Sequence, residues 1–523
     1  MSNPAAPKDP AEQHQAGQHA EHIDDMATLA KGGRTNTLGF VLRLIGGGPF
    51  LFVGYRLYGV EDMGRFASAF VIIEIFALFC ALGEKRGLAQ RLTEGADEDG
   101  QPGVNLVFDG MLAALFVSAL VAIILLLFPS IMFPNGTNGS LDIWMVSAIP
   151  AFALTEILLA AQAYRYDIAT TVQARALVEP WVKSIAVVAF FYLPGTRESG
   201  LALAFIVAIY AALLTALWSF VRTYGLPKGW RPRPRYLGKM TLRAMPLSGA
   251  DVIERSTRLL DVFLLGQFTS ERAVGIYFFA KEVATLPQKL KSSFEPILSP
   301  VITKNLKSGN LSAIASQVRQ VGFWIIALQA AIALALAIPG EAVMGLGGPA
   351  IVGGTGALAI LLAAEVVASM AVVSESVLVY IARKRNLAIS VGAIALQAVL
   401  TVGLIMLTDH LQMDEGFKAA GAAAALFLAL GMSSLIKAFL LKKLLKAPVN
   451  NWRWALVWAT GPAVVVGFLT TLLPEWAELV FGIPAILAVY GFVIWHRGFG
   501  PEDRVLFRKN VGGPTADQAG ASK

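Results

Sequence analysis

Long apolar runs separated by short polar segments fill the chain between residues 36 and 496. About 20 consecutive apolar residues can cross a bilayer as a helix, because a helix satisfies its own backbone hydrogen bonds in lipid. The pattern therefore predicts an all-α polytopic membrane protein. We predict about 14 transmembrane helices, at 36–58, 66–83, 104–133, 143–163, 174–194, 200–221, 245–268, 275–301, 321–341, 355–381, 387–408, 416–441, 454–473 and 478–496.

Composition agrees with a membrane protein, and the sequence offers no sign of a disulfide, a metal site or a cofactor site. The chain of 523 residues is 56% hydrophobic and only 15% charged, whereas soluble domains carry about 25% charged residues. Its single cysteine, Cys80, cannot form an internal disulfide. No metal-ligand spacing and no glycine-rich phosphate loop is found, so we expect neither a metal nor a bound cofactor.

Lysine and arginine gather on every second loop. They are dense in 84–91, 164–167, 222–243, 383–385, 442–446 and the C-terminal tail, whereas the alternate loops hold only Arg65, Arg197, Arg272 and Lys418. Cytoplasmic loops carry the basic residues, so both termini are predicted to face the cytoplasm. The net charge of +7 then lies beside lipid, and anionic headgroups rather than nucleic acid are its expected partner.

The seventh and eighth spans are the least apolar. In GADVIERSTRLLDVF (249–263) the helical phase places all five charges within an arc of about 120°, and the eighth span collects polar residues on one side in the same way. Charges in a bilayer normally face a watery cavity or a partner. The two helices could line a hydrophilic chamber or form an amphipathic hairpin on the cytoplasmic surface. The residues concerned are Asp251, Glu254, Arg255, Arg258, Asp261, Lys281 and Lys289.

Further charges lie inside predicted spans. Arg43 and Glu74 are deep enough in the first and second spans to favour a cavity role. Glu179 and Lys183 are four residues apart and are expected to form a local pair. Lys437 lies near the end of its span and is expected to extend toward the interface.

Two turns of the chain have similar amino-acid sequences. GVEDMGRFASAF (59–70) aligns with TSERAVGIYFFA (269–280), which places Gly64 opposite Gly275 at an offset of 211 residues, the difference between 275 and 64. Six spans separate the two turns, so both halves cross the membrane in the same direction. This describes a parallel repeat, with a substrate site expected between the halves.

The same stretches carry a family resemblance. LYGVEDMGRFASAFVIIEIFALFCALG and DVFLLGQFTSERAVGIYFFAKEVATLPQKLKSSFEPILSP resemble the polysaccharide-repeat (O-antigen/exopolysaccharide, Wzx-like) flippases of the multidrug/oligosaccharidyl-lipid/polysaccharide exporter superfamily. The resemblance implies two six-helix lobes around a central cavity plus two C-terminal helices. The parts would be a cytoplasmic tail at 1–30, lobes at 31–222 and 245–446 joined by a basic linker at 223–244, an extra helix pair at 447–497 and a cytoplasmic tail at 498–523.

The resemblance also implies a function. Such a transporter, not an enzyme, would move a polyprenyl-pyrophosphate-linked oligosaccharide to the outer leaflet of the bacterial inner membrane by alternating access, upstream of polysaccharide polymerase machinery. Whether H⁺ or Na⁺ drives it stays open. Arginine suits a diphosphate because its planar fork donates two hydrogen bonds. The substrate-binding candidates are Arg43, Arg255, Arg258, Lys281 and Lys289, and the acids expected to hold these cations or a coupling ion are Glu74, Asp251, Glu254 and Asp261.

Three alternatives remain. A drug/cation antiporter of the same superfamily would use a buried acid such as Glu74 as its ion site. A peptidoglycan-precursor (lipid II, MurJ-like) flippase would need the same diphosphate chemistry. A membrane-embedded polysaccharide polymerase or ligase would normally need a substantial outer domain, whereas the predicted outer loops are short.

Overall fold

The computed structural model of the chain is helical, with no strand among the residues that it describes. These are residues 46–84, 87–89, 91–93, 103–227, 229–231, 234–291, 306 and 311–500. The chain divides into two compact units, Met1–Gly275 and Ile276–Lys523. The predicted all-α architecture is confirmed.

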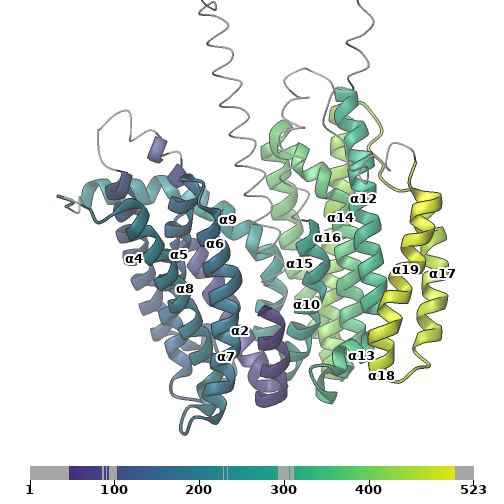
Figure 1. Ribbon diagram of the computed structural model, residues 1–523, viewed down its shortest axis with the longest axis horizontal. Coiled ribbons are helices and arrows are strands. Elements are labelled where there is room, and N and C mark those ends of the chain that lie inside the picture. Colours follow the sequence, from purple (N-terminus) through teal and green to yellow (C-terminus); the bar gives the residue numbers. More distant parts are fainter. Residues whose placement is uncertain are drawn as a thin grey trace, which may run out of the picture. The chain divides into compact units, whose positions relative to one another are not determined.

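The first unit begins with helical residues 46–58 and ends within α10 (Figure 1). A turn of π-helix, Gln173–Val178, joins α6 to α7 without a break. The short 3₁₀ segments of this unit are Pro129–Ile131, Asp142–Ser147 and Arg197–Ser199. Its α-helices are α2 (Val60–Cys80), α4 (Gly103–Leu127), α5 (Ala148–Tyr164), α6 (Ile168–Val172), α7 (Glu179–Tyr192), α8 (Gly200–Tyr224), α9 (Pro234–Phe268) and the start of α10 (Glu271–Lys291).

The core of the first unit lies between α4, α5 and α8. Val107, Ile157 and Phe220 are fully buried there, and the Phe220 ring stacks on Tyr224 with centroids 4.8 Å apart. α8 ends because Gly225 adopts a positive φ of 76°, a conformation that favours glycine. These contacts hold α5 and α8 as a rigid support for the charged residues described below.

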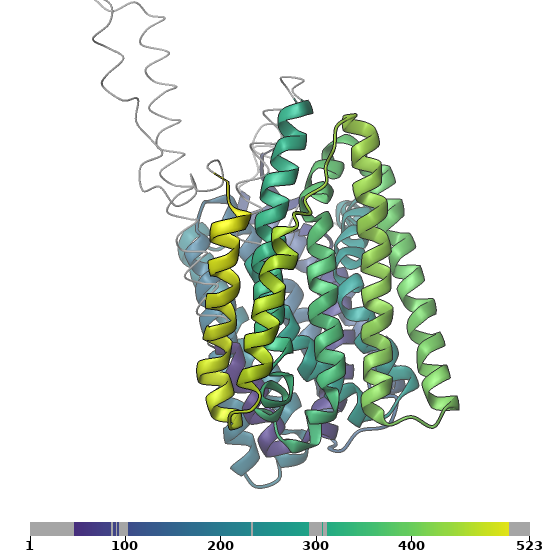
Figure 2. The same cartoon turned by 90° about the vertical axis from the view of Figure 1, so that its right-hand side faces the viewer.

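The second unit continues from α10 and packs around α14. The pairs α14–α16 and α15–α16 are its most extensive contacts, and α17 and α19 pack together beside α12 (Figure 2). Its short segments are α13 (Gly340–Gly345), Pro349–Gly354, α18 (Glu475–Ala477), Glu478–Gly482 and Ile494–Gly498. Its longer helices are α12 (Leu311–Ala337), α14 (Thr355–Ile381), α15 (Arg383–His410), α16 (Glu415–Leu445), α17 (Ala455–Thr470) and α19 (Ile483–Val493).

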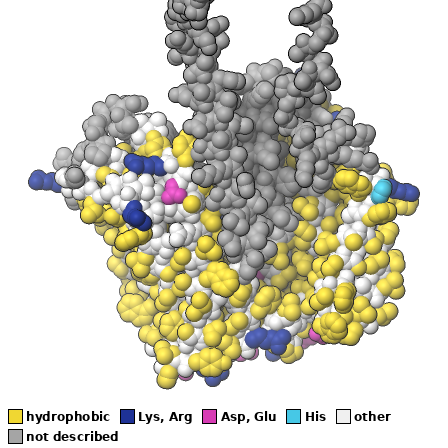
Figure 3. Space-filling model, in the orientation of Figure 1, with side chains coloured by type: hydrophobic (Ala, Val, Ile, Leu, Met, Phe, Trp, Pro, Cys, Tyr) yellow, Lys and Arg dark blue, Asp and Glu magenta, His cyan; other side chains and the backbone are white. Residues whose placement is uncertain are grey.

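Large apolar side chains face outward on both units. Phe116 of α4 is 73% exposed and Trp218 of α8 is 70% exposed. Figure 3 shows hydrophobic side chains over much of the visible face of the first unit, with Lys and Arg near its upper end and further Lys and Arg at the lower edge of the molecule. A soluble monomer rarely exposes so much contiguous apolar surface. The chain is therefore a multi-pass membrane protein.

Nine helical segments of the described residues are long and apolar enough to span a bilayer, and α17 is a shorter apolar helix. The figure of fourteen spans stays a prediction. The seventh predicted span is helical, since α9 runs without a break from the predicted linker through 245–268. The described part of the eighth is also helical, since α10 continues to Lys291 and contains Pro287, while 292–301 lie outside the described residues. Both helices carry too many charged residues to be identified as membrane spans from composition alone.

Candidate functional site

An ion pair joins α9 to α2 in the first unit. Nε and Nη2 of Arg255 both donate to Oε1 of Glu74, at 2.9 and 2.5 Å. The Glu74 side chain is only 11% exposed, but the Arg255 side chain is 43% exposed. Of this pair, the arginine is therefore the partner that an incoming anion can reach.

The second oxygen of Glu74 has no donor. Its Oε2 is buried and makes no hydrogen bond, although buried carboxylate oxygens normally have partners. Arginine offers five N–H donors, and this pair uses two of them on a single oxygen. The ion pair is thus incomplete on the acid side, which leaves a buried acceptor for a proton, a cation or a hydroxyl donor.

The neighbouring residues of α9 divide into two environments. Arg258 is half-buried and Asp261 is fully buried. A carboxylate oxygen of Asp261 lies 2.8 Å from the backbone N–H of Val262, which donates to it. α9 packs along α2, and Ser248 donates to the carbonyl of Phe79 at 2.7 Å. The charged side of α9 therefore lies against α2 in part, and only in part toward open space.

The other predicted site residues fare differently. Lys281 is half-buried in the second unit, with its Nζ 5.7 Å from the centroid of the Tyr277 ring. Arg43 and the side chains of Asp251, Glu254 and Lys289 lie outside the described part of the chain. The roles assigned to all of these residues stay predictions.

A second cluster of charges sits at the π-helical turn. Arg175 donates to Glu156 of α5 at 2.5 Å and to Glu179 of α7 at 2.7 Å, and its guanidinium lies 4.2 Å from the centroid of the Phe152 ring. Its side chain is only 10% exposed. Two carboxylates already occupy this arginine, so it serves to fix α5 against α7 and is a poor candidate for an exchangeable anion contact.

Gly64 and Gly275 meet where α2 crosses the start of α10. A Cβ added to Gly64 would lie 2.8 Å from the backbone N of Gly275 and closer still to the carbonyl oxygen of Glu271, and one added to Gly275 would collide with the carbonyl oxygen of Val60. The contact is reciprocal, because Val60 and Glu271 differ by the same 211 residues as the two glycines. Only residues without a side chain allow the two backbones this close.

Polar side chains fasten this crossing. The Nε of Arg65 donates to Glu271 at 2.8 Å, and a second guanidinium N–H of Arg65 donates to the other oxygen of Glu271. Its Nη1 also donates to Asp62 at 2.9 Å, and Asp62 accepts a further hydrogen bond from Asn138 at 2.5 Å. A bidentate arginine–carboxylate pair is the strongest arrangement of these groups, so the crossing is held by both packing and charge.

The second unit contains its own buried cation. Lys437 of α16 donates to Glu375 of α14 at 2.9 Å and to Ser390 of α15 at 3.2 Å. Lys437 is only 5% exposed, so the expectation that it extends toward the interface was wrong. The Lys437 side chain points inward because the Glu375 carboxylate and the Ser390 hydroxyl accept hydrogen bonds from it there.

Sequence reasoning missed Arg175 and the pairing of Lys437 with Glu375. The spacing of Arg175 and Glu179, four residues apart, carried a usable signal. The partners Glu156 and Glu375 come from other helices, and a single sequence gives no indication of which spans adjoin. Glu179 forms an ion pair with Arg175, and the Nζ of Lys183 lies 4.4 Å from the centroid of the Phe50 ring.

The sequence matches one protein family. A family model described as polysaccharide biosynthesis protein covers residues 41–306, just over half of the chain. No curated protein matches the sequence significantly.

Solved structures show the fold. A lipid II flippase, MurJ, in an inward closed conformation has a TM-score of 0.64 at 11% identity, over 92% of this chain and 100% of that one. An inward-facing multidrug resistance transporter of the MATE family has a TM-score of 0.58 at 16% identity, over 78% and 99%. A MOP superfamily transporter from Pyrococcus furiosus has a TM-score of 0.53 at 15% identity, over 80% and 95%. The chain thus has the multi-helix fold of these transporters.

Proposed function

Because the chain belongs to the polysaccharide biosynthesis protein family, we propose that it is a flippase for a polyprenyl-pyrophosphate-linked oligosaccharide. It acts in the bacterial inner membrane, with both termini in the cytoplasm, and supplies the outer leaflet for surface polysaccharide assembly. A diphosphate carrying sugars cannot cross hydrocarbon unaided, whereas the polyprenyl tail can stay in lipid. The protein therefore has to shelter the charged head and leave the tail outside.

The exposed arginine of the α2–α9 pair carries this proposal. Arg255 uses Nε and Nη2 on Glu74 and is 43% exposed, so its remaining donors are available to a phosphate. A partly exposed ion pair is worth about 1 kcal/mol or less. A charge-assisted bond from arginine to a diphosphate is worth about 1.5–3 kcal/mol, which draws Arg255 from its acid once Glu74 gains another partner.

When Arg255 exchanges Glu74 for the diphosphate, substrate binding is linked to a conformational change of the protein. When Arg255 turns to the diphosphate, both oxygens of Glu74 lose their cation, and its buried Oε2 already has no donor. A buried carboxylate without a partner is unfavourable, so Glu74 takes up a proton or Na⁺ at that point. Uptake of the ion favours the substrate-bound state by its differential affinity.

The Gly64–Gly275 crossing is the element that has to open and close. Its glycine contact and the Arg65–Glu271 pair hold α2 to α10, and alternating access requires one such contact to part in each cycle. In this proposal the crossing is closed in the state described above and opens after the substrate has bound.

Reconstituted vesicles test the proposal. Flipping of a polyprenyl-diphosphate-linked oligosaccharide is measured as the fraction that becomes accessible to a hydrolase added outside. Arg255→Gln should slow flipping about 10- to 150-fold, as expected for the loss of about 1.5–3 kcal/mol. Arg222→Gln removes another exposed charge, from α8, and should leave flipping unchanged. Equal rates for Arg255→Gln and the parent protein would remove Arg255 from the mechanism.

Lipid II is a second candidate substrate, because one of the solved structures is named a lipid II flippase. Deletion in the host distinguishes the two. Loss of surface polymer with accumulation of a lipid-linked oligosaccharide on the cytoplasmic side supports the first substrate, whereas arrest of growth with accumulation of lipid II supports the second. Drug sensitivity with intact surface polymer would instead indicate an antiporter.

A further inference from the structure

The end of the second unit where α15 begins and α16 ends carries six exposed basic residues. α15 and α16 run antiparallel, as the contact of Lys437 with Ser390 and the approach of Gly421 to Leu404 show. The first turn of α15 and the last turns of α16 therefore lie at the same end. The basic residues there, called the basic end below, are Arg383, Lys384, Arg385, Lys442, Lys443 and Lys446.

The two chain segments that form the basic end contain no acidic residue. Residues 376–390 and 438–449 contain no Asp or Glu, and all six basic side chains are exposed. Lys442, Lys443 and Lys446 border a cavity of about 480 Å³ together with Phe439, Ala447 and Pro448. The basic end is thus a concentrated positive surface rather than one side of a salt-bridge network.

The helix dipoles favour the basic residues of α16 but not those of α15. Lysines at the end of α16 interact favourably with the negative end of that helix dipole. Arg383, Lys384 and Arg385 instead occupy the first turn of α15, where no acid and no side-chain cap is present and where a cation is unfavourable by about 0.3–1 kcal/mol each. An anion from outside the chain would offset this cost.

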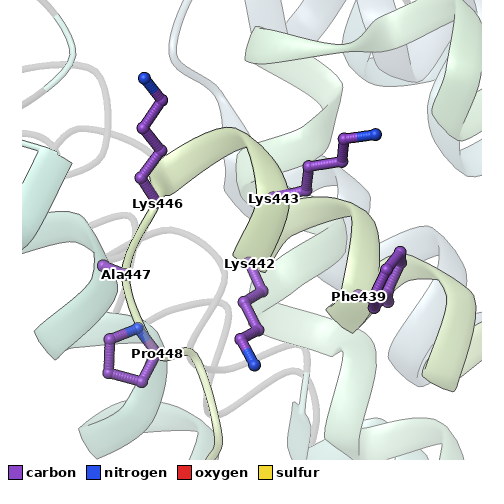
Figure 4. A pocket seen from close by; sticks show the side chains of 6 residues that line it. All are labelled: Phe439, Lys442, Lys443, Lys446, Ala447 and Pro448. Atoms are coloured by element: carbon purple, nitrogen blue, oxygen red, sulfur yellow. The ribbon is translucent and has the colours of Figure 1, made fainter.

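The surroundings identify the anion as a lipid. Phe439 is 70% exposed, Tyr380 51% and Leu387 46%, directly beside the basic residues. Figure 4 shows the amino groups of Lys442, Lys443 and Lys446 pointing in different directions from the last turns of α16. Diverging cations reach several separate headgroups, whereas one soluble anion would need them to converge and would gain nothing from exposed apolar side chains.

We propose that the basic end binds anionic phospholipids of the surrounding leaflet, with their phosphates on the six cations and their acyl chains against Phe439 and its apolar neighbours. Such a contact anchors this end of the α15–α16 pair at the membrane surface. Each cation of the basic end that contacts a headgroup contributes about fivefold to affinity for that lipid, and the effect weakens as salt shortens the Debye length. The proposal is independent of what the protein transports.

The test counts lipids that stay on the intact protein. The full chain is extracted from vesicles of equimolar phosphatidylglycerol and phosphatidylcholine with a mild detergent, and bound lipids are counted by native mass spectrometry. The variant Lys442→Gln, Lys443→Gln, Lys446→Gln should lower the ratio of bound phosphatidylglycerol to phosphatidylcholine by roughly a hundredfold. The matched variant Arg222→Gln, Arg231→Gln, Arg497→Gln removes the same charge from exposed positions elsewhere and should lower it much less.

Three outcomes overturn the proposal. An equal fall in the phosphatidylglycerol ratio in the two variants would mean that only net charge matters. No fall in the variant of Lys442, Lys443 and Lys446 would mean that the basic end binds no anionic lipid. Displacement of phosphatidylglycerol by low concentrations of inorganic diphosphate would show a site for a soluble anion. A charge-reversed control, Lys442→Glu, Lys443→Glu, Lys446→Glu, should prefer phosphatidylcholine outright if the protein remains monodisperse.

Discussion

Replacing Gly64 by alanine should loosen the crossing of α2 and α10. The new methyl group would lie closer to the Glu271 carbonyl oxygen than a real Cβ ever approaches another atom, and only 2.8 Å from the backbone N of Gly275. The obstacle is backbone on a neighbouring helix, so no side chain can rotate away. One helix has to move by about 1 Å, and the bidentate contact of Arg65 with Glu271 has to stretch with it.

The size of the effect follows from this overlap. Forcing an extra methyl group into a closely packed contact costs about 1–3 kcal/mol. Because the collision exists only while the crossing is closed, the whole penalty falls on the closed state. The ratio of open to closed crossing should therefore rise about 5- to 150-fold.

Thiol labelling measures that ratio. Val274 is fully buried beside the crossing, and the single native cysteine, Cys80, is also fully buried. In a Cys80→Ala background, Val274→Cys reacts with a maleimide only when the crossing opens, so the labelling rate reports the open fraction. Gly64→Ala should raise this rate by the same 5- to 150-fold.

Gly249→Ala is the control, because a Cβ on Gly249 of α9 meets nothing within 4 Å. It should leave the labelling rate unchanged. Equal labelling rates for the Gly64→Ala and parent proteins, with both monodisperse, would refute the view that the glycine contact holds the crossing closed.

Three further variants probe other parts of the structure. Arg175→Ala leaves two half-buried carboxylates without their cation and should lower stability by up to about 3 kcal/mol, seen as a drop in melting temperature that Glu156→Gln partly reverses. Lys437→Met should cost only about 1 kcal/mol, because its partner Glu375 is 43% exposed and can be solvated; a loss as large as that of Arg175→Ala would contradict this. Gly225→Ala forces a side chain into a backbone conformation with φ 76° and ψ −171° and should cost about 1–3 kcal/mol, measurable in the same melting curves.

Much of the architecture was predictable because lipid imposes a simple rule. Any long apolar run has to become a helix, so the helices could be predicted from hydropathy. The family could be predicted from the amino-acid sequence around Gly64 and Gly275. The charged side of α9 was predictable from helical phase, and Arg255 does lie exposed on it.

The partners were not predictable, because they depend on which helices adjoin. The sequence offered Glu74, Asp251, Glu254 and Asp261 as candidate acids, and only the last three lie on the helix of Arg255. Among the side chains that the structure describes, the acid that binds Arg255 is Glu74 of α2, and nothing in the sequence indicates that these two helices adjoin. Likewise, nothing in the surroundings of Lys437 within its own span points to Glu375, and hydropathy alone placed that lysine at the interface.

The reciprocal contact of Gly64 and Gly275 also bears on how such a chain arises. An interface in which one surface patch meets its own equivalent is isologous, the kind that relates two identical subunits by a two-fold axis. Here Gly64 meets Glu271 while Gly275 meets Val60, and both pairs exchange when 211 residues are added or subtracted. In a homodimer of half-length chains, the two contacts would be one contact made twice, by a single glycine beside the axis. The crossing therefore preserves, within one polypeptide, the self-complementary packing expected of a duplicated ancestor.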